Sequence, residues 1–178
     1  MEWIALRGSV FDIADLYGAR LRYSDLRGVQ ATFACFGQAD LTGANLRDAA
    51  FSWCEMEGLN LSKSGGVHTR FQNCGLEQSI WHAARYEGAN LSDLRANGAE
   101  FNGAVLRDCL IHDCRMGNVN FMCADLQGTE FKRVVLHGAN MRNADLRGTT
   151  IEDIELIGAI LPDAAPKAWR EAHARQNR

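Results

Sequence analysis

Residues 39–48 read Ala-Asp-Leu-Thr-Gly-Ala-Asn-Leu-Arg-Asp, two units of five residues in which a small, a polar and a large apolar residue follow one another. The same order returns at 139–148, as Ala-Asn-Met-Arg-Asn-Ala-Asp-Leu-Arg-Gly. In both directions from these stretches, every fifth residue from Leu6 to Leu161 keeps the phase, and almost all of these positions hold a large apolar side chain. A repeat this regular determines the fold before any single residue does.

A period of five matches neither the α-helix nor a plain β-strand. Residues two apart on a strand share a face, so the small residue and the apolar residue of each unit both point inward. The other two residues must turn the chain, and most of the 17 glycines lie there, where a tight corner needs a positive φ. A chain that turns every five residues winds into a solenoid, with each rung paired to the next.

The number of sides follows from which residues match one another along the rod. A spacing of 20 aligns Phe51 with Phe71 and Cys54 with Cys74, whereas a spacing of 15 gives poorer sets. We therefore predict an all-β, four-sided β-helix of about eight rungs, roughly 35–40 Å long at the usual distance between strands.

The units at 39–48, 89–93 (ANLSD), 124–128 (ADLQG) and 139–148 resemble those of the pentapeptide-repeat family. The resemblance covers about residues 4–161 and implies a right-handed quadrilateral β-helix.

The domain division follows from where the repeat ends. We predict a repeat domain at 1–161 and a helical cap or tail at 162–178, with Asp163 as the helix N-cap. A helix here either covers the last rung or, as in several family members, makes a dimer; its many basic residues favour the cover.

Residues 62–69 are the weakest part of the repeat, because Gly66 stands where an apolar side chain belongs. A rung without its core residue loses packing unless it deforms. We expect a bulge or small loop there.

A search for reactive groups points away from catalysis. Cys109, His112 and Cys114 have the spacing of metal ligands, but the repeat turns both cysteines inward on different sides and places His112 on an outward corner. We expect Cys54 and Cys74 to be reduced core residues, although they stack one rung apart. The glycines follow the corner period and form no phosphate-binding loop. The sequence thus predicts a protein that is not an enzyme, with no metal and no cofactor.

Composition narrows the class of protein. The chain has 178 residues, of which 47% are hydrophobic and 23% charged, and a formal net charge of −3. This balance argues against disorder and against direct nucleic-acid binding. The N-terminus lacks the basic region and apolar core of a signal peptide, and no apolar run is long enough for a membrane span. We expect a cytoplasmic protein without a membrane partner.

The surface is where we expect function. Ile13, Phe33 and Trp53 occupy one corner column, either packed along the wall or exposed as an interface for a second copy or a partner. The family resemblance implies a role in protecting DNA gyrase and topoisomerase IV from antibiotics or toxins by mimicking duplex DNA. The outward acids proposed to carry such binding are Asp93, Asp108, Asp113 and Asp125. The alternative is a scaffold, a regulator or effector with an unrelated partner, and the stack of Arg7, Arg27 and Arg47 weighs against a uniform DNA mimic.

Overall fold

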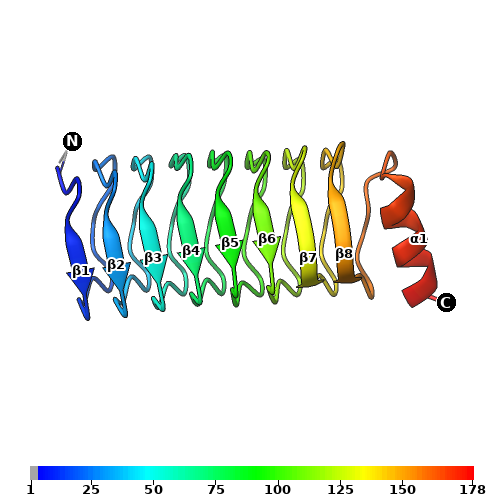
Figure 1. Cartoon of the computed structure of the whole chain (residues 1–178), viewed down its shortest axis with the longest axis horizontal. Helices are drawn as coiled ribbons and strands as arrows, with labels where there is room; N and C mark the ends of the chain where they lie inside the picture. Colours follow the sequence, from blue (N-terminus) through cyan, green and yellow to red (C-terminus); the bar gives the residue numbers. More distant parts are fainter. Residues whose placement is uncertain (1–3) are drawn as a thin grey trace.

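The computed structural model describes residues 4–178, and it shows a straight β-solenoid closed at its C-terminal end by one helix (Figure 1). Eight short strands form a single parallel sheet in chain order, and each is displaced by 20 residues from the one before. The strands are β1 (Val10–Asp12), β2 (Gln30–Thr32), β3 (Ala50–Ser52), β4 (Arg70–Gln72), β5 (Asn90–Ser92), β6 (Leu110–His112), β7 (Glu130–Val135) and β8 (Thr150–Glu155).

The other three sides are held together by single parallel bridges with the same displacement of 20 residues. We call the side of the strands face A; the chain then passes through face B (Asp15↔Cys35), face C (Arg20↔Asp40) and face D (Asp25↔Asn45). The four-sided prediction is confirmed, with one turn of the solenoid between each strand and the next.

The corners share one backbone conformation. Every fifth residue from Gly8 to Gly158 has a positive φ, and these corner residues comprise 12 glycines and 19 residues of other types. Glycine adopts this conformation without steric cost, which explains why glycine recurs in this phase.

Stacked side chains of equivalent positions fill the axis of the rod. On face C, Phe101 lies between Trp81 and Phe121, with ring centroids 4.9 and 5.0 Å apart. Phe51 and Phe71 stack in the same way behind face A, 5.0 Å apart. All five rings are buried, so the apolar phase read from the sequence is the core.

Residues 62–69 form neither a bulge nor a loop, and our prediction there was wrong. The turn keeps its phase, and Gly65 makes the expected bridges to Asn45 and Arg85. The reason lies one turn further along the chain, where the buried ring of Tyr86 fills the space that a side chain at Gly66 would occupy.

The C-terminal helix α1 (Lys167–Gln176) packs against β8 at the end of the rod (Figure 1). Trp169 is fully buried, edge-on to Phe131 at 5.2 Å, and its indole nitrogen donates to Thr149 Oγ1 at 2.9 Å. Asp163 is not the N-cap. A turn closed by Ala165 N and Pro162 O delays the helix, and Pro166 occupies the cap without a side-chain hydrogen bond.

Two amide side chains form hydrogen bonds with backbone groups of the last solenoid turn. They belong to Gln176, the last residue of α1, and to Asn177, which follows it. Gln176 accepts from Leu156 N at 2.5 Å and donates to Ile154 O at 2.8 Å. Asn177 accepts from Gly158 N at 2.7 Å and donates to Leu156 O at 3.1 Å. These bonds replace the pairing that another rung would supply, so α1 acts as a cover for the open end.

Candidate interaction surface

The residues with metal-ligand spacing do not converge. Cys109 and Cys114 point into the core, and burial raises the pKa of each thiol to about 12. His112 lies in β6 rather than at a corner, with its Nε2 3.2 Å from a carboxylate oxygen of Glu130. Within residues 4–178, no group of three metal-ligating side chains comes together. Cys54 and Cys74 are buried free thiols, as expected.

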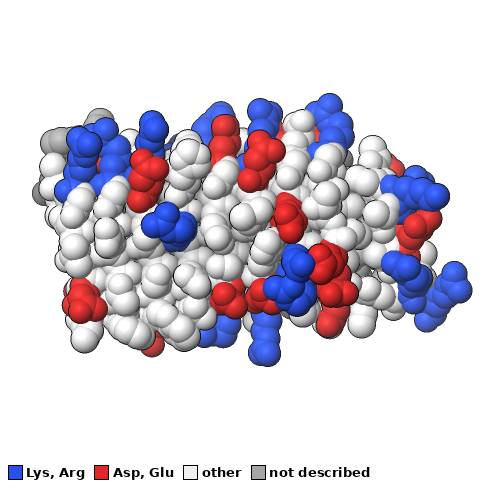
Figure 2. Space-filling model, viewed as in Figure 1, with Lys and Arg blue, Asp and Glu red and all other residues white. Residues whose placement is uncertain are grey.

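The corner between faces A and B carries an aromatic ridge formed by Ile13, Phe33 and Trp53. Their exposed fractions are 78%, 59% and 56%, so these side chains project into solvent and do not cover the wall. The rings of Phe33 and Trp53 stack with centroids 6.3 Å apart and an angle of 25° between planes. In Figure 2 the surface at the lower ends of β2 and β3 is largely uncharged, apart from a small acidic area at the very edge.

The ridge occupies an unfavourable backbone conformation. Ile13, Phe33 and Trp53 have φ values of 53°, 53° and 57°. A β-branched or bulky residue at positive φ is strained by about 1–3 kcal/mol, whereas glycine or asparagine would fit there at little cost. Burial in the core does not explain the choice, because more than half of each side chain is exposed.

The same corner becomes polar towards the C-terminus, with Asn73, Asp93, Asp113, Arg133 and Asp153 in the following turns. Two hydrogen bonds of 2.6 Å join Asp113 to the guanidinium of Arg133, and they hold the pKa of Asp113 below its ordinary value. Asp93 has no such partner among the described residues. The proposed acids on this corner are therefore partly neutralised.

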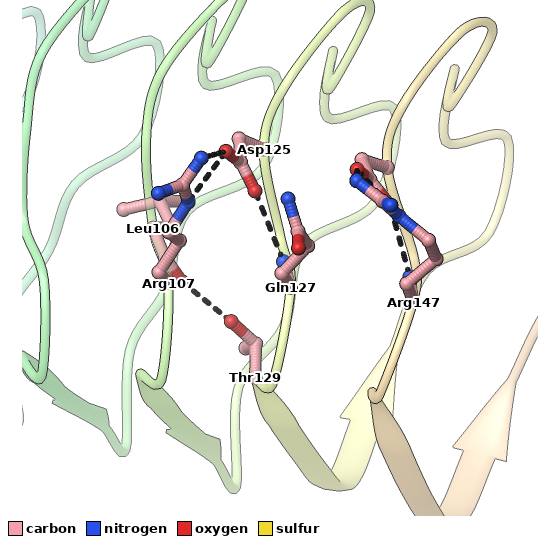
Figure 3. A network of polar contacts seen from close by, with 7 residues as sticks. Leu106, Arg107, Asp125, Gln127, Thr129 and Arg147 are labelled. Atoms are coloured by element: carbon pink, nitrogen blue, oxygen red, sulfur yellow. Dashed lines mark hydrogen bonds and ion pairs between the residues drawn. The ribbon is translucent and has the colours of Figure 1, made fainter.

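The other two proposed acids lie elsewhere. Asp108 is a corner residue between faces D and A, and Asp125 is on face D. Asp125 accepts hydrogen bonds from Arg107 at 2.6 Å and from the backbone of Gln127 at 3.3 Å (Figure 3). Burial opposes its ionisation, but these donors outweigh burial and lower its pKa. The structure does not bring the four candidate acids into one surface.

The two long sides of the rod differ in net charge. Comparison of single corner columns in the sequence did not predict this difference. Faces A and B with the corner between them, here called the acidic half, carry eleven acidic and five basic residues, a net charge of −6. The remainder of residues 4–161 carries eight acidic and ten basic residues, a net charge of +2. The acids of the acidic half are Asp12, Asp15, Glu55, Glu57, Glu77, Asp93, Asp113, Glu130, Glu152, Asp153 and Glu155.

A groove of about 450 Å³ lies on face B beside the ridge. Gly37 and Gly75 leave its floor open, and the ring of Tyr17 lies over Gly37. Glu55 and Glu57 line the walls of the groove, together with Cys35 and Met56. Glu77 lines it one turn further along the rod. Arg95 closes one end, where its Nε lies 3.1 Å from Glu77 Oε1.

Fold and surface together define a solenoid that presents long, differently charged faces. The pattern of the family described as Pentapeptide repeats matches eight copies in the chain, over residues 11–48, 24–62, 87–122, 99–138 and 114–153. The chain belongs to the pentapeptide-repeat family. No curated protein matches it in sequence.

The fold is shared with a solved structure. A trypsin-treated variant of QnrB1, a plasmid-mediated fluoroquinolone resistance protein, is similar with a TM-score of 0.63 and 15% identity, over 98% of this chain and 96% of that one. HetL, a pentapeptide-repeat protein involved in heterocyst differentiation regulation from the cyanobacterium Nostoc, is 21% identical over 91% of each chain, with a TM-score of 0.21. In residues 4–178, the one helix is too short and too polar to cross a membrane.

Proposed function

We propose that the protein is a non-catalytic binding protein of the cytoplasm, and that its acidic half docks on a positively charged surface of DNA gyrase or topoisomerase IV. The observation that carries the proposal is the net charge of −6 on faces A and B. A surface that binds duplex DNA is lined with cations that neutralise phosphates. A rigid rod with acids repeated on one side can compete for such a surface, and protection from topoisomerase-targeting antibiotics or toxins would follow from that competition.

The charge asymmetry changes which acids matter. Asp93 lies on the corner of the acidic half, whereas Asp108 lies on the opposite edge of face A. Asp125 is tied to Arg107 and belongs to the half with a net charge of +2. Binding to a cationic surface should therefore depend on Asp93 and on the acids of face B more than on Asp108 or Asp125. It should also weaken steeply with salt, since exposed charges are screened.

A supercoiling assay tests the proposal. The protein is titrated into gyrase and into topoisomerase IV, with and without a quinolone or a peptide toxin. We expect inhibition or protection that falls with added salt. Asp93→Asn combined with Glu155→Gln should weaken the effect, and Asp108→Asn combined with Asp125→Asn is the matched control with the same change in charge. If the protein neither inhibits nor protects at concentrations up to roughly the micromolar range, the topoisomerase proposal is contradicted. Equal losses in both pairs would contradict the acidic half as the interface.

A second candidate is a scaffold for an unrelated partner, or a homodimer. The exposed ridge of Ile13, Phe33 and Trp53 favours this candidate, because mimicry of DNA gives no role to apolar side chains. Light scattering distinguishes a homodimer from a monomer whose ridge is free to bind another protein.

A further inference from the structure

We propose that the aromatic ridge and the face B groove form one docking site, and that its occupant is an extended segment of a partner protein in which lysine or arginine alternates with apolar residues. The site lies on the first four turns, around Phe33, Trp53, Glu55 and Glu57. It does not depend on the topoisomerase proposal, which rests on charges distributed along the whole rod.

The apolar part of the site is larger than the ridge alone. Tyr17, exposed by 66%, lies on face B at the edge of the groove. Val10 is also exposed, on face A at the other end of β1 from Ile13. Removal of these apolar side chains from water on docking is favourable. Nineteen corner residues other than glycine share the positive φ, so the backbone conformation does not by itself distinguish the ridge; its bulky apolar side chains do, because they stay exposed to water until a partner covers them.

The acidic part of the site has unused binding capacity. Among residues 4–178, neither Glu55 nor Glu57 forms an ion pair, and both side chains are exposed in the groove. Glu77 shows how a cation is held there, because the guanidinium of Arg95 extends over Gly75 and pairs with the Glu77 carboxylate. A guanidinium or ammonium group from a partner can pair with the carboxylate of Glu57, which occupies the position equivalent to Glu77 one turn earlier.

The two parts lie side by side in a way that specifies the occupant. The chain passes from Trp53 at the corner to Glu55 on face B within two residues, so the apolar ridge runs along the rod axis beside the acidic groove. Successive side chains of an extended segment point to opposite sides. A segment lying along the boundary between the ridge and the groove therefore directs one set of side chains at Phe33 and Trp53, and the alternate set over face B, where Glu55 and Glu57 lie on one turn. A cation can also lie over the exposed Trp53 ring.

Other occupants fit less well. Nucleic acid is repelled by the carboxylates of the groove. A second copy offers Arg7, Arg27 and Arg47 as its stacked cations, but the corner residues beside Arg7 and Arg27 are Gly8 and Gly28, which supply no apolar side chain for the ridge.

The test uses fluorescence anisotropy with a labelled peptide of alternating arginine and leucine. Control peptides replace arginine with glutamate or leucine with serine. We expect saturable binding of the first peptide only, weakened by salt. Phe33→Asn with Trp53→Asn should reduce affinity by about tenfold or more, the loss expected for aromatic anchors. Asparagine tolerates the left-handed corner, so the fold is retained, and circular dichroism checks this.

Matched variants separate this site from general effects of charge and surface. Tyr23→Asn removes an exposed aromatic residue from another left-handed corner, and Glu87→Gln neutralises the acid at the equivalent position of face D, as Glu57→Gln does on face B. Tyr23→Asn and Glu87→Gln should leave affinity unchanged, whereas Glu57→Gln should weaken it severalfold. Equal effects of paired variants, equal binding of the control peptides, or no binding would overturn the proposal. Self-association lost in the Phe33 and Trp53 variants would assign the ridge to a second copy and would also overturn it.

Discussion

The ring of Tyr86 occupies the space that a side chain at Gly66 would fill, one turn earlier on face D, and its hydroxyl lies 2.8 Å from Ser64 Oγ. A Cβ at residue 66 would overlap Tyr86 Cε1 and Thr69 Oγ1. Ser64 also donates to Leu61 O at 2.6 Å, so the buried hydroxyl groups are paired. One large residue thus compensates for the absence of another across two turns.

The first prediction is that Gly66 and Tyr86 are energetically coupled. Gly66→Leu restores the apolar residue of the repeat but overpacks the core, at a cost of about 1–3 kcal/mol. Tyr86→Leu leaves a cavity above Gly66 and costs about 2–4 kcal/mol. The double variant fills the same space with two leucines and should be more stable than the sum of the single changes predicts, by about 0.5–3 kcal/mol. Urea unfolding of the four proteins measures this coupling, and additive losses would contradict it.

The second prediction separates the core from the wall. Phe101→Ala removes the middle ring of the stack between Trp81 and Phe121 and should cost about 3–5 kcal/mol. Leu126→Ala, also fully buried, should cost about 2–5 kcal/mol. Gln127→Ala changes the next residue, whose side chain faces outward, and should stay within about 0.5 kcal/mol. Chemical denaturation decides between these outcomes, and similar losses at Leu126 and Gln127 would mean that the inward and outward positions are misassigned.

The fold was predictable because the repeat acts locally. A small residue such as Ala39, an apolar residue such as Leu41 and a glycine such as Gly43 each meet a steric requirement within their own five residues. The error at Gly66 has a different origin. Its compensation comes from Tyr86, 20 residues away, and a unit-by-unit reading treats each five-residue unit as independent.

The surface was less predictable, because its interactions cross between turns. Arg107 pairs with Asp125 and Arg133 with Asp113, at separations of 18 and 20 residues. The sequence places these residues in columns, but the choice of partner depends on side-chain reach. The exposure of Phe33 and Trp53 was likewise one of two open readings, since a corner side chain can lie along the wall or project from it.

The third prediction concerns the cover at the C-terminal end. Gln176→Ala with Asn177→Ala removes the amides that pair with Ile154, Leu156 and Gly158, and water replaces them. We expect a loss of about 1–3 kcal/mol, since each hydrogen bond contributes about 0.5–1.5 kcal/mol. An uncovered rung also exposes a sheet edge, so the variant should aggregate on heating.

Thermal unfolding followed by circular dichroism and light scattering measures both effects of the cover. Lys167→Ala, in the exposed first turn of α1, is the control. Unchanged stability and solubility in the double variant would show that the amides contribute nothing to the cover.

The last prediction is a loss of stability in acid that depends on Asp25. Arg27 donates to both carboxylate oxygens of Asp25, at 2.7 and 2.6 Å, and holds the pKa of Asp25 at about 2. In the unfolded chain an aspartate has a pKa of about 3.9. A pKa that is lower in the folded state stabilises the fold above the unfolded pKa, and this contribution is lost as the pH falls from about 4 towards 2. We therefore expect the unfolding temperature of the wild type to fall more steeply across this range than that of Asp25→Asn. The difference between the two proteins should shrink towards pH 2, since a protonated Asp25 no longer carries the charge that Arg27 stabilises. Asp108→Asn, which removes an exposed corner acid without an arginine partner among the described residues, should leave the wild-type slope unchanged. Parallel curves for the wild type and Asp25→Asn would show that the ion pair of Asp25 and Arg27 does not contribute to stability.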